Sequence, residues 1–181
     1  GGYENKIPAY AFASSDAAPY NGCAVSTIYV GTTGYEIIKP NYVGDYAFYG
    51  NSHITGLNLE HVDYIGELAF QDASNFKGLP VYGGVVTLTA SRVYPHAFDG
   101  TKVTHFQFLN SVTTDYYSLA SSELKQIQYV ANPLSINANQ VADPTKVQIF
   151  ADPSQETIFF SNYGGFYPYS QIWKHEGYPA N

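Results

Sequence analysis

Apolar residues recur along this chain in two alternating patterns. The first is a six-residue phrase that begins with a β-branched residue and, in four of its five copies, ends in Ala-Phe. The residue three positions after each copy has a small side chain. Because the phrase is too short for a full helix, it predicts one helical turn or a tight bend. The five copies are IPAYAF (7–12), VGDYAF (43–48), IGELAF (65–70), VYPHAF (93–98) and the weaker TDYYSL (114–119).

The second pattern is a short apolar triplet that follows each phrase. Two residues separate the first and second apolar positions, and one residue separates the second and third. The last two positions have the period of a β-strand, in which alternate side chains point to opposite faces. The copies are VSTIYV (25–30), ITGLNL (54–59), VVTLTA (85–90), VTHFQF (103–108), LKQIQY (124–129) and the weaker PTKVQI (144–149), with middle apolar positions at 28, 57, 88, 106, 127 and 147.

Together the two patterns describe one repeated unit: a strand, a turn, a Phe-bearing bend and a second turn. One such unit cannot bury its apolar side alone, whereas stacked units can, so the repeats predict a solenoid. We expect a parallel sheet of five to six short strands on one face and bends on the other. The Phe side chains should then form an internal column, and each small residue should leave room for the turn of the coil.

The chain resembles the BspA-like leucine-rich repeat family of bacterial surface proteins, whose unit reads roughly LxxIxIPxSVTxIGxxAFxxC. The matching stretches are VTHFQFLNSVT (103–113) and YIGELAFQDA (64–73), and the resemblance extends over residues 7–150. Departures are the scarcity of Leu, the missing Pro after the strands and the replacement of Cys after Ala-Phe. The resemblance implies a curved right-handed solenoid with the parallel sheet on its concave face. It also implies a secreted or surface-attached protein that acts in adhesion or host interaction.

The repeats set the expected domain organisation. Residues 1–150 should form the solenoid, with insertions at 13–24, 31–42 and 71–84. Residues 151–181 break the pattern while staying aromatic, and we expect them to cap the open end of the solenoid, where an uncovered strand edge would invite aggregation. An aromatic platform for sugars is the alternative for this segment. Its large aromatic residues are Phe159, Phe160, Phe166, Tyr167 and Trp173.

Residues between the apolar strand positions should point outward and form the candidate partner surface. Their hydroxyl and amide groups donate and accept hydrogen bonds without fixed charge, which suits a glycan or a peptide backbone. A polar, solvated sheet face without a ligand is the plain alternative. The candidates on the concave face are Thr27, Tyr29, Asn58, Thr87, Thr89, His105, Gln107, Gln126, Gln128 and Gln148, and the candidate edge-loop contacts are Tyr20, Phe76 and Tyr82.

Composition and charge narrow the partners. A net charge of −7 with eight Lys and Arg argues against nucleic acid. No apolar run is long enough to span a bilayer, so we expect no membrane insertion of this segment. Cys23 is the single cysteine, which excludes an internal disulfide, and we expect neither a cofactor nor a metal. The chain contains no Met, so we expect Gly1 to lie inside a longer reading frame or to follow added residues, with a removed secretion signal.

The sequence argues against catalysis. Glycoside hydrolysis usually needs two carboxylates facing each other across the substrate, and the expected outward positions carry neither Asp nor Glu. The motifs GxSxG, GxxxxGK and HExxH are absent. His96 and Asp99 could offer ligands to a metal, but we expect a surface pair. Three hypotheses follow: a non-catalytic adhesion module binding a host or extracellular-matrix protein or a glycan, a structural spacer in a larger surface protein, and a carbohydrate-active enzyme.

Overall fold

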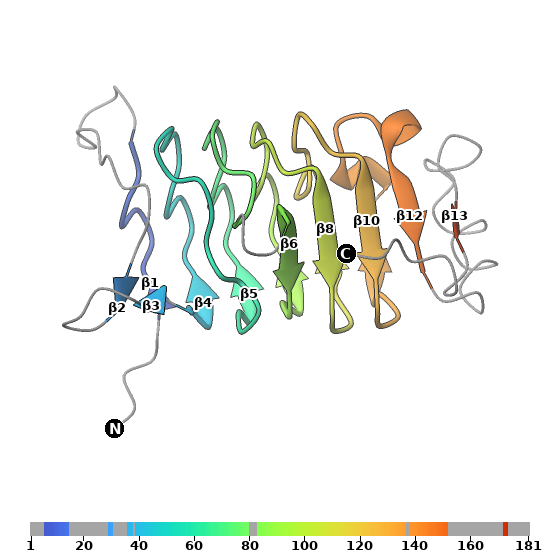
Figure 1. Cartoon of the computed structure of the whole chain (residues 1–181), viewed down its shortest axis with the longest axis horizontal. Helices are drawn as coiled ribbons and strands as arrows, with labels where there is room; N and C mark the ends of the chain where they lie inside the picture. Colours follow the sequence, from blue (N-terminus) through green and yellow to red (C-terminus); the bar gives the residue numbers. More distant parts are fainter. Residues whose placement is uncertain are drawn as a thin grey trace.

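The computed structural model describes residues 6–14, 29–30, 36–37, 39–79, 83–136, 138–151 and 172–173. The chain forms a β-solenoid whose coils stack side by side in chain order along the longest axis (Figure 1). Two parallel sheets share one hydrophobic core that runs from Ile7 to Ala151. The predicted repeat solenoid is therefore confirmed.

One sheet has six two-residue strands, and the first five each consist of the first residue of a phrase and the residue before it. In these five strands the first residue points outward and the second points into the core, as in Arg92 and the fully buried Val93. The sequence patterns predicted only bends here, because two residues are too short to show a period of two. In spatial order the strands are β1 (Lys6–Ile7), β4 (Tyr42–Val43), β5 (Tyr64–Ile65), β7 (Arg92–Val93), β9 (Thr113–Thr114) and β11 (Ser135–Ile136), all parallel.

The other sheet contains four longer strands that the sequence predicted and the two-residue β13 (Ile172–Trp173), which it did not predict; all five are parallel. In spatial order they are β6 (Val85–Leu88), β8 (His105–Phe108), β10 (Gln126–Tyr129), β12 (Gln148–Phe150) and β13. The aligned inward positions are Val86, Phe106, Ile127 and Ile149. The expected middle positions 88 and 147 were thus each wrong by two residues. A shift of two keeps the inward and outward sides but changes which residues are neighbours.

Two other predicted strands are absent from this sheet. Residues 29 and 30 form β2 (Tyr29–Val30), which pairs antiparallel with β3 (Glu36–Ile37) in a separate hairpin. In the segment 54–59 the apolar side chains are buried as expected, but the backbone makes no strand. Gly56 packs instead against the insertion, where a Cβ on Gly56 would lie 2.7 Å from the carbonyl carbon of Gly78. The inserted chain therefore occupies the place of a neighbouring strand.

The predicted phenylalanine column is present and continuous. Successive ring centroids of Phe12, Phe48, Phe70 and Phe98 are 5.2, 5.0 and 5.1 Å apart, and the rings are stacked. The backbone N–H groups of Phe12, Phe48 and Phe70 each donate to the carbonyl of the Ala before the next Phe, at 2.7 Å. Leu119 takes the following place in the column and is fully buried. Ring stacking and the backbone ladder thus hold successive coils in the same register.

The bends share one left-handed backbone position. In all five phrases the residue two positions before the last one has a positive φ, although none of the five is glycine. These residues are Tyr10, Tyr46, Leu68, His96 and Tyr117, with φ of 59°, 57°, 54°, 55° and 52°. Such a conformation costs about 1 kcal/mol or more in an L-residue. The ladder stabilises it, since Tyr46 N–H donates to Glu67 O at 2.9 Å and Leu68 N–H to Pro95 O at 3.0 Å.

Several of the small residues after the phrases are hydrogen-bonded rather than merely small. Buried Asn51 donates from Nδ2 to Phe12 O at 3.0 Å, while its Oδ1 accepts from the N–H groups of His53 and Ile54. Thr101 Oγ1 donates to Phe98 O at 2.7 Å. Asn51 therefore links two coils and also caps the start of the next segment.

The ends of the chain are described in part. Two 3-10 turns, η2 (Ala138–Gln140) and η3 (Pro144–Lys146), precede β12. Strand β13 pairs its backbone with β12, so residues 172 and 173 cover that strand edge. The rest of the expected cap, and most of the insertions at 13–24 and 31–42, lie outside the described residues. The insertion at 71–84 is narrower than expected, because Ala73 and Phe76 belong to the core.

We expect the column to be most sensitive at its centre. Phe70 is fully buried and packs against Phe48, Phe98 and Phe76, whereas Phe12 is partly buried and has Phe48 on one side. Phe70→Ala should lower the free energy of unfolding by about 3–5 kcal/mol, the usual cost for a buried aromatic. Phe12→Ala should cost distinctly less. Urea denaturation measures the free energy of unfolding of both variants. An equal decrease in the two would contradict the view that stability depends most on the centre of the column.

Ser118 offers a stabilising test of the same repeat. It stands where the other phrases have Ala, it is fully buried, and its hydroxyl oxygen has no hydrogen-bond partner. Ser118→Ala should therefore raise the free energy of unfolding by about 1 kcal/mol, because it removes an unsatisfied buried group. The matched change Ala97→Ser, at the same position one coil earlier, should lower it. Thermal unfolding of the pair would contradict this reasoning if both changes had the same sign.

Candidate binding surfaces

The polar face consists of the outward side chains of β6, β8, β10 and β12. Since side chains alternate along a strand, two rows cross this face. The first row contains Val85, His105, Gln126 and Gln148, and the second contains Thr87, Gln107, Gln128 and Phe150. The middle positions expected from the sequence would have put Thr87 beside His105 and Gln148 beside Gln128. In the structure Thr87 lies beside Gln107, and Gln148 lies beside Gln126.

The second row is a hydrogen-bonded ladder. Thr87 Oγ1 donates to Gln107 Oε1 at 3.2 Å, and Gln107 Nε2 donates to Gln128 Oε1 at 3.1 Å. Each of these side chains is half-buried. The amides thus satisfy one another while keeping donors in reserve, since within the described residues the Gln128 amide nitrogen makes no hydrogen bond. A partner would meet a rigid row of fixed donors and acceptors.

The first row is centred on His105. Its Nδ1 lies 2.8 Å from Thr104 Oγ1. Burial lowers the pKa of His105 below 6.5, the Lys125 charge lowers it further, and the Gln126 hydrogen bond opposes the shift. Gln126 is only 8% exposed, whereas Gln148 is exposed. The accessible part of this row is therefore His105 and Gln148.

Other predicted contacts are less accessible than expected. Asn58 is 4% exposed, and its Oδ1 accepts from Glu60 N–H at 3.0 Å. Thr89 Oγ1 donates to Val62 O at 2.9 Å. The prediction that Phe76 is an edge-loop contact is wrong, because Phe76 is fully buried and packs against Phe70 and Phe98. Tyr29 lies in the β2–β3 hairpin instead of the polar face.

Thr27, Tyr20 and Tyr82 lie outside the described residues. Their predicted contacts with a partner therefore stay predictions.

A second surface, on the six-stranded sheet, was missed by the sequence reasoning. We call it the tyrosine face and define it as Tyr42, Asp45, Tyr46, Tyr64, Glu67 and Tyr94. The row of first strand residues aligns Lys6, Tyr42, Tyr64, Arg92, Thr113 and Ser135. The signal that could have found it is the aromatic residue directly before the first residue of the second and third phrases, which becomes outward-facing once that pair is seen as a strand.

Aromatic contacts order this face. The ring centroids of Tyr42 and Tyr64 are 4.3 Å apart with their planes at 77°, and those of Tyr64 and Tyr94 are 5.9 Å apart at 60°. A hydrogen bond with Tyr64 raises the pKa of Tyr42 to about 12, with further contributions from burial and from the Tyr64 and Asp45 charges. The hydroxyl of Tyr42 is therefore protonated at neutral pH.

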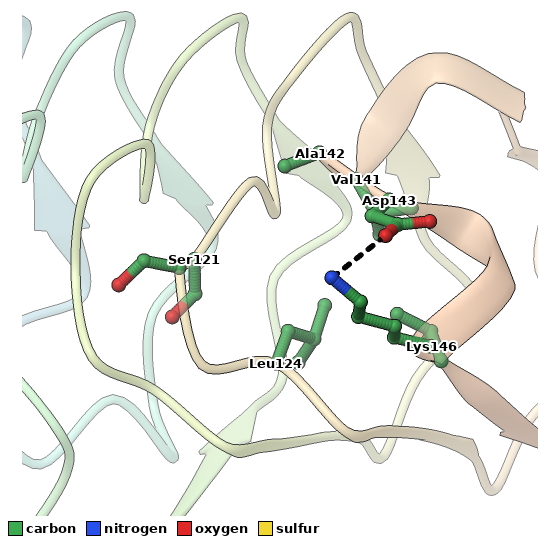
Figure 2. Close-up of a pocket in the computed structure, with 8 residues that line it drawn as sticks. Ser121, Leu124, Val141, Ala142, Asp143 and Lys146 are labelled. Carbon is green, nitrogen blue, oxygen red and sulfur yellow. Dashed lines mark ion pairs between the residues drawn. The ribbon is translucent and has the colours of Figure 1, made fainter.

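A hollow near the C-terminal coils is too small for an organic ligand. Figure 2 shows Ser121, Leu124, Val141, Asp143 and Lys146 around it, with Lys146 Nζ 3.0 Å from Asp143 Oδ2. Its volume is about 60 Å³, whereas ligand pockets have about 300 Å³ or more. This hollow is therefore not a candidate ligand site, and the two candidate sites described above are surfaces.

Among the described residues, His96 and Asp99 form the His–Asp pair that the sequence predicted. His96 Nδ1 lies 2.9 Å from Asp99 Oδ2, and both side chains are partly exposed, so the expected surface pair is present. Over the described ranges, no group of three His, Cys, Asp or Glu residues could hold a metal ion. In the same ranges, no helix has the length and apolar character needed to cross a membrane.

Comparison with known families now identifies the class. A family model for the BspA type leucine rich repeat region matches residues 5–117 and 41–163 in six copies. The chain belongs to this family, as its resemblance predicted. The match counts one copy more than the five phrases; in the structure Gln140 and Val141 take the places of Ala and Phe in a further coil, and Leu119 N–H donates to Gln140 O at 2.8 Å. No curated protein and no solved structure matches the chain.

His105 should make stability depend on pH. Its pKa in the folded chain lies below the ordinary 6.5, so the unfolded chain binds a proton more readily. The destabilisation should be absent above pH 6.5 and grow as the pH falls through that value. Thermal unfolding should therefore show a steeper acid loss of Tm in the wild-type chain than in His105→Gln, which places in this row the residue found at positions 126 and 148. Parallel acid profiles for the two proteins would rule this effect out.

Proposed function

We propose that this chain is a non-catalytic binding module of a secreted or cell-surface protein, and that it recognises a protein or a glycan through its polar face. Membership of the BspA-type family supports the setting, since proteins of this family are typically surface-associated. The observation that carries the proposal is the ladder of Thr87, Gln107 and Gln128, which presents uncharged donors and acceptors on a rigid parallel sheet.

The corrected register strengthens the case against catalysis on this sheet. Both outward rows still lack Asp and Glu after realignment, and glycoside hydrolysis relies on two carboxylates. Asp45 and Glu67 do lie on neighbouring coils of the other sheet, where Asp45 Oδ1 accepts from Glu67 N–H. Both side chains are exposed, whereas a catalytic acid is usually held in an apolar environment that keeps it protonated.

A structural spacer is the second candidate, and one observation favours it. The amides of the second row bond to one another, and Asn58 is bonded within its own coil. A solvated sheet face would satisfy its polar groups in the same way. Such a spacer would hold other parts of a longer surface protein apart and would bind nothing through this face.

A binding screen separates the two candidates. We expect the chain to bind at least one member of a mixed panel of glycans and extracellular-matrix proteins, measured by biolayer interferometry. Gln107→Ala and Gln128→Ala should each weaken that binding by about fivefold, because each removes hydrogen bonds worth about 1 kcal/mol. The control Asn132→Ala removes an exposed amide away from the ladder and should have no effect. Silence across the whole panel would favour the spacer.

An enzyme assay completes the test. Incubation of the chain with the same polysaccharides should release no reducing sugars. If reducing sugars were released by the wild-type chain but not by Glu67→Gln, the non-catalytic proposal would be wrong, and the active site would include Glu67 beside the six-stranded sheet.

A further inference from the structure

The tyrosine face combines half-buried and exposed rings with carboxylates that make no ion pair within the described residues. Tyr64 is 37% exposed, and Asp45 and Glu67 are exposed on the neighbouring bends. Within the described ranges neither carboxylate takes part in an ion pair. Asp45 Oδ1 accepts from Glu67 N–H at 2.9 Å, which fixes the Asp45 side chain and leaves its other oxygen available.

One coil further along, the chain supplies its own example of a bound guanidinium. The Arg92 guanidinium carbon lies 4.6 Å from the centroid of the Tyr94 ring. Arg92 Nε and Nη2 donate to the two carboxylate oxygens of Asp115 at 2.9 and 3.3 Å. A tyrosine ring and a carboxylate on adjacent coils thus hold an arginine by cation–π attraction and a bidentate hydrogen bond.

In the two preceding coils the tyrosines and carboxylates are present without the arginine. Tyr42 and Tyr64 occupy the row position of Arg92. A hydrogen bond with Tyr64 is the main cause of the raised pKa of Tyr42, and burial is that of Tyr46; the Asp45 charge adds to the first shift and the Glu67 charge to the second, so negative potential reaches these two rings. The face is therefore complementary to positive charge.

We propose that the tyrosine face binds an arginine-bearing segment of a partner protein, with guanidinium groups seated between the Tyr64 ring and the carboxylates of Asp45 and Glu67. Arginine fits better than lysine because its planar group can stack on a ring and bond a carboxylate in bidentate fashion at the same time. Lys6 aligns with Tyr42 and Arg92 aligns with Tyr64 in the same row, but Arg92 is already paired with Asp115; Tyr64 is the most exposed ring of the face and marks the centre of the site. This surface lies on the other sheet and does not depend on the polar face.

The test uses a fluorescein-labelled peptide of alternating arginine and serine, followed by fluorescence anisotropy with the whole chain. The same peptide with citrulline in place of arginine keeps the shape and removes the charge. We expect the citrulline peptide to bind at least tenfold more weakly. Asp45→Asn and Glu67→Gln should each weaken binding of the arginine peptide by about tenfold, and Tyr64→Leu by about two- to fivefold.

Glu123→Gln is the matched control, because it removes one exposed carboxylate elsewhere on the solenoid. It should leave the affinity within twofold of wild type. An equal loss in Glu123→Gln and Glu67→Gln would overturn the proposal, since binding would then reflect the net charge of −7. Failure of the arginine peptide to bind the wild-type chain would overturn the proposal as well. If a glycan then bound to the wild-type chain but not to Tyr64→Leu, the tyrosine face would be a glycan site instead.

The two proposals can fail separately. Peptide binding that is lost in Gln107→Ala but retained in Glu67→Gln would overturn the tyrosine-face inference and leave the polar-face proposal in place. Peptide binding that is lost in Glu67→Gln, together with silence of the polar-face screen, would support the tyrosine face and count against the polar face.

Discussion

The spacing between stacked phenylalanine rings is the constraint on which the rest of the structure depends. Ring centroids about 5 Å apart in the column of Phe48, Phe70 and Phe98 match the separation of neighbouring hydrogen-bonded strands, about 4.8 Å. Backbone bonds and side-chain packing therefore require the same rise per coil. Every outward residue consequently repeats at that rise, and a row of similar side chains on neighbouring coils becomes a ladder.

The column changes its position toward the C-terminal coils. After Phe98 the buried residue at this position of the coil is Leu119 and then Val141, and the position before it holds Ser118 and then Gln140. The lost ring volume is filled from the other sheet, where Phe106 lies 5.0 Å from Phe98 and Phe108 stacks on Tyr129 at 5.5 Å. Within the described residues, four buried side-chain oxygens have no hydrogen-bond partner: those of Thr114, Ser118 and Gln140 lie in these coils, and that of Asn41 lies nearer the N-terminus.

The sequence was informative where one large side chain recurs at one position. The Phe phrases predicted the column and the bends, and the alternation in HFQF and QIQY predicted β8 and β10. The register of β6 was wrong, because VVTLTA carries apolar residues at 85, 86 and 88 and the triplet fits more than one alignment. Strands of two residues leave no periodic signal, so the only sign that Tyr42 and Tyr64 are outward neighbours was that each directly precedes a phrase. Phe76 was misassigned because it lies within the apparent insertion, whereas its burial and its contacts with Phe70 and Phe98 place it in the core.

The two faces differ in what a partner must overcome to bind. On the polar face, a ligand must compete with hydrogen bonds already made between Thr87, Gln107 and Gln128. Apart from the bond that the Gln128 amide nitrogen can donate, each new bond therefore replaces an existing one and adds little net free energy. On the tyrosine face, the rings are held by neighbouring rings and the carboxylates lack ion-pair partners within the described residues. Ordered rings lose little conformational entropy when a partner covers them. A cation there gains an interaction that the free chain does not make for itself, so the tyrosine face has more unused binding energy than the amide ladder.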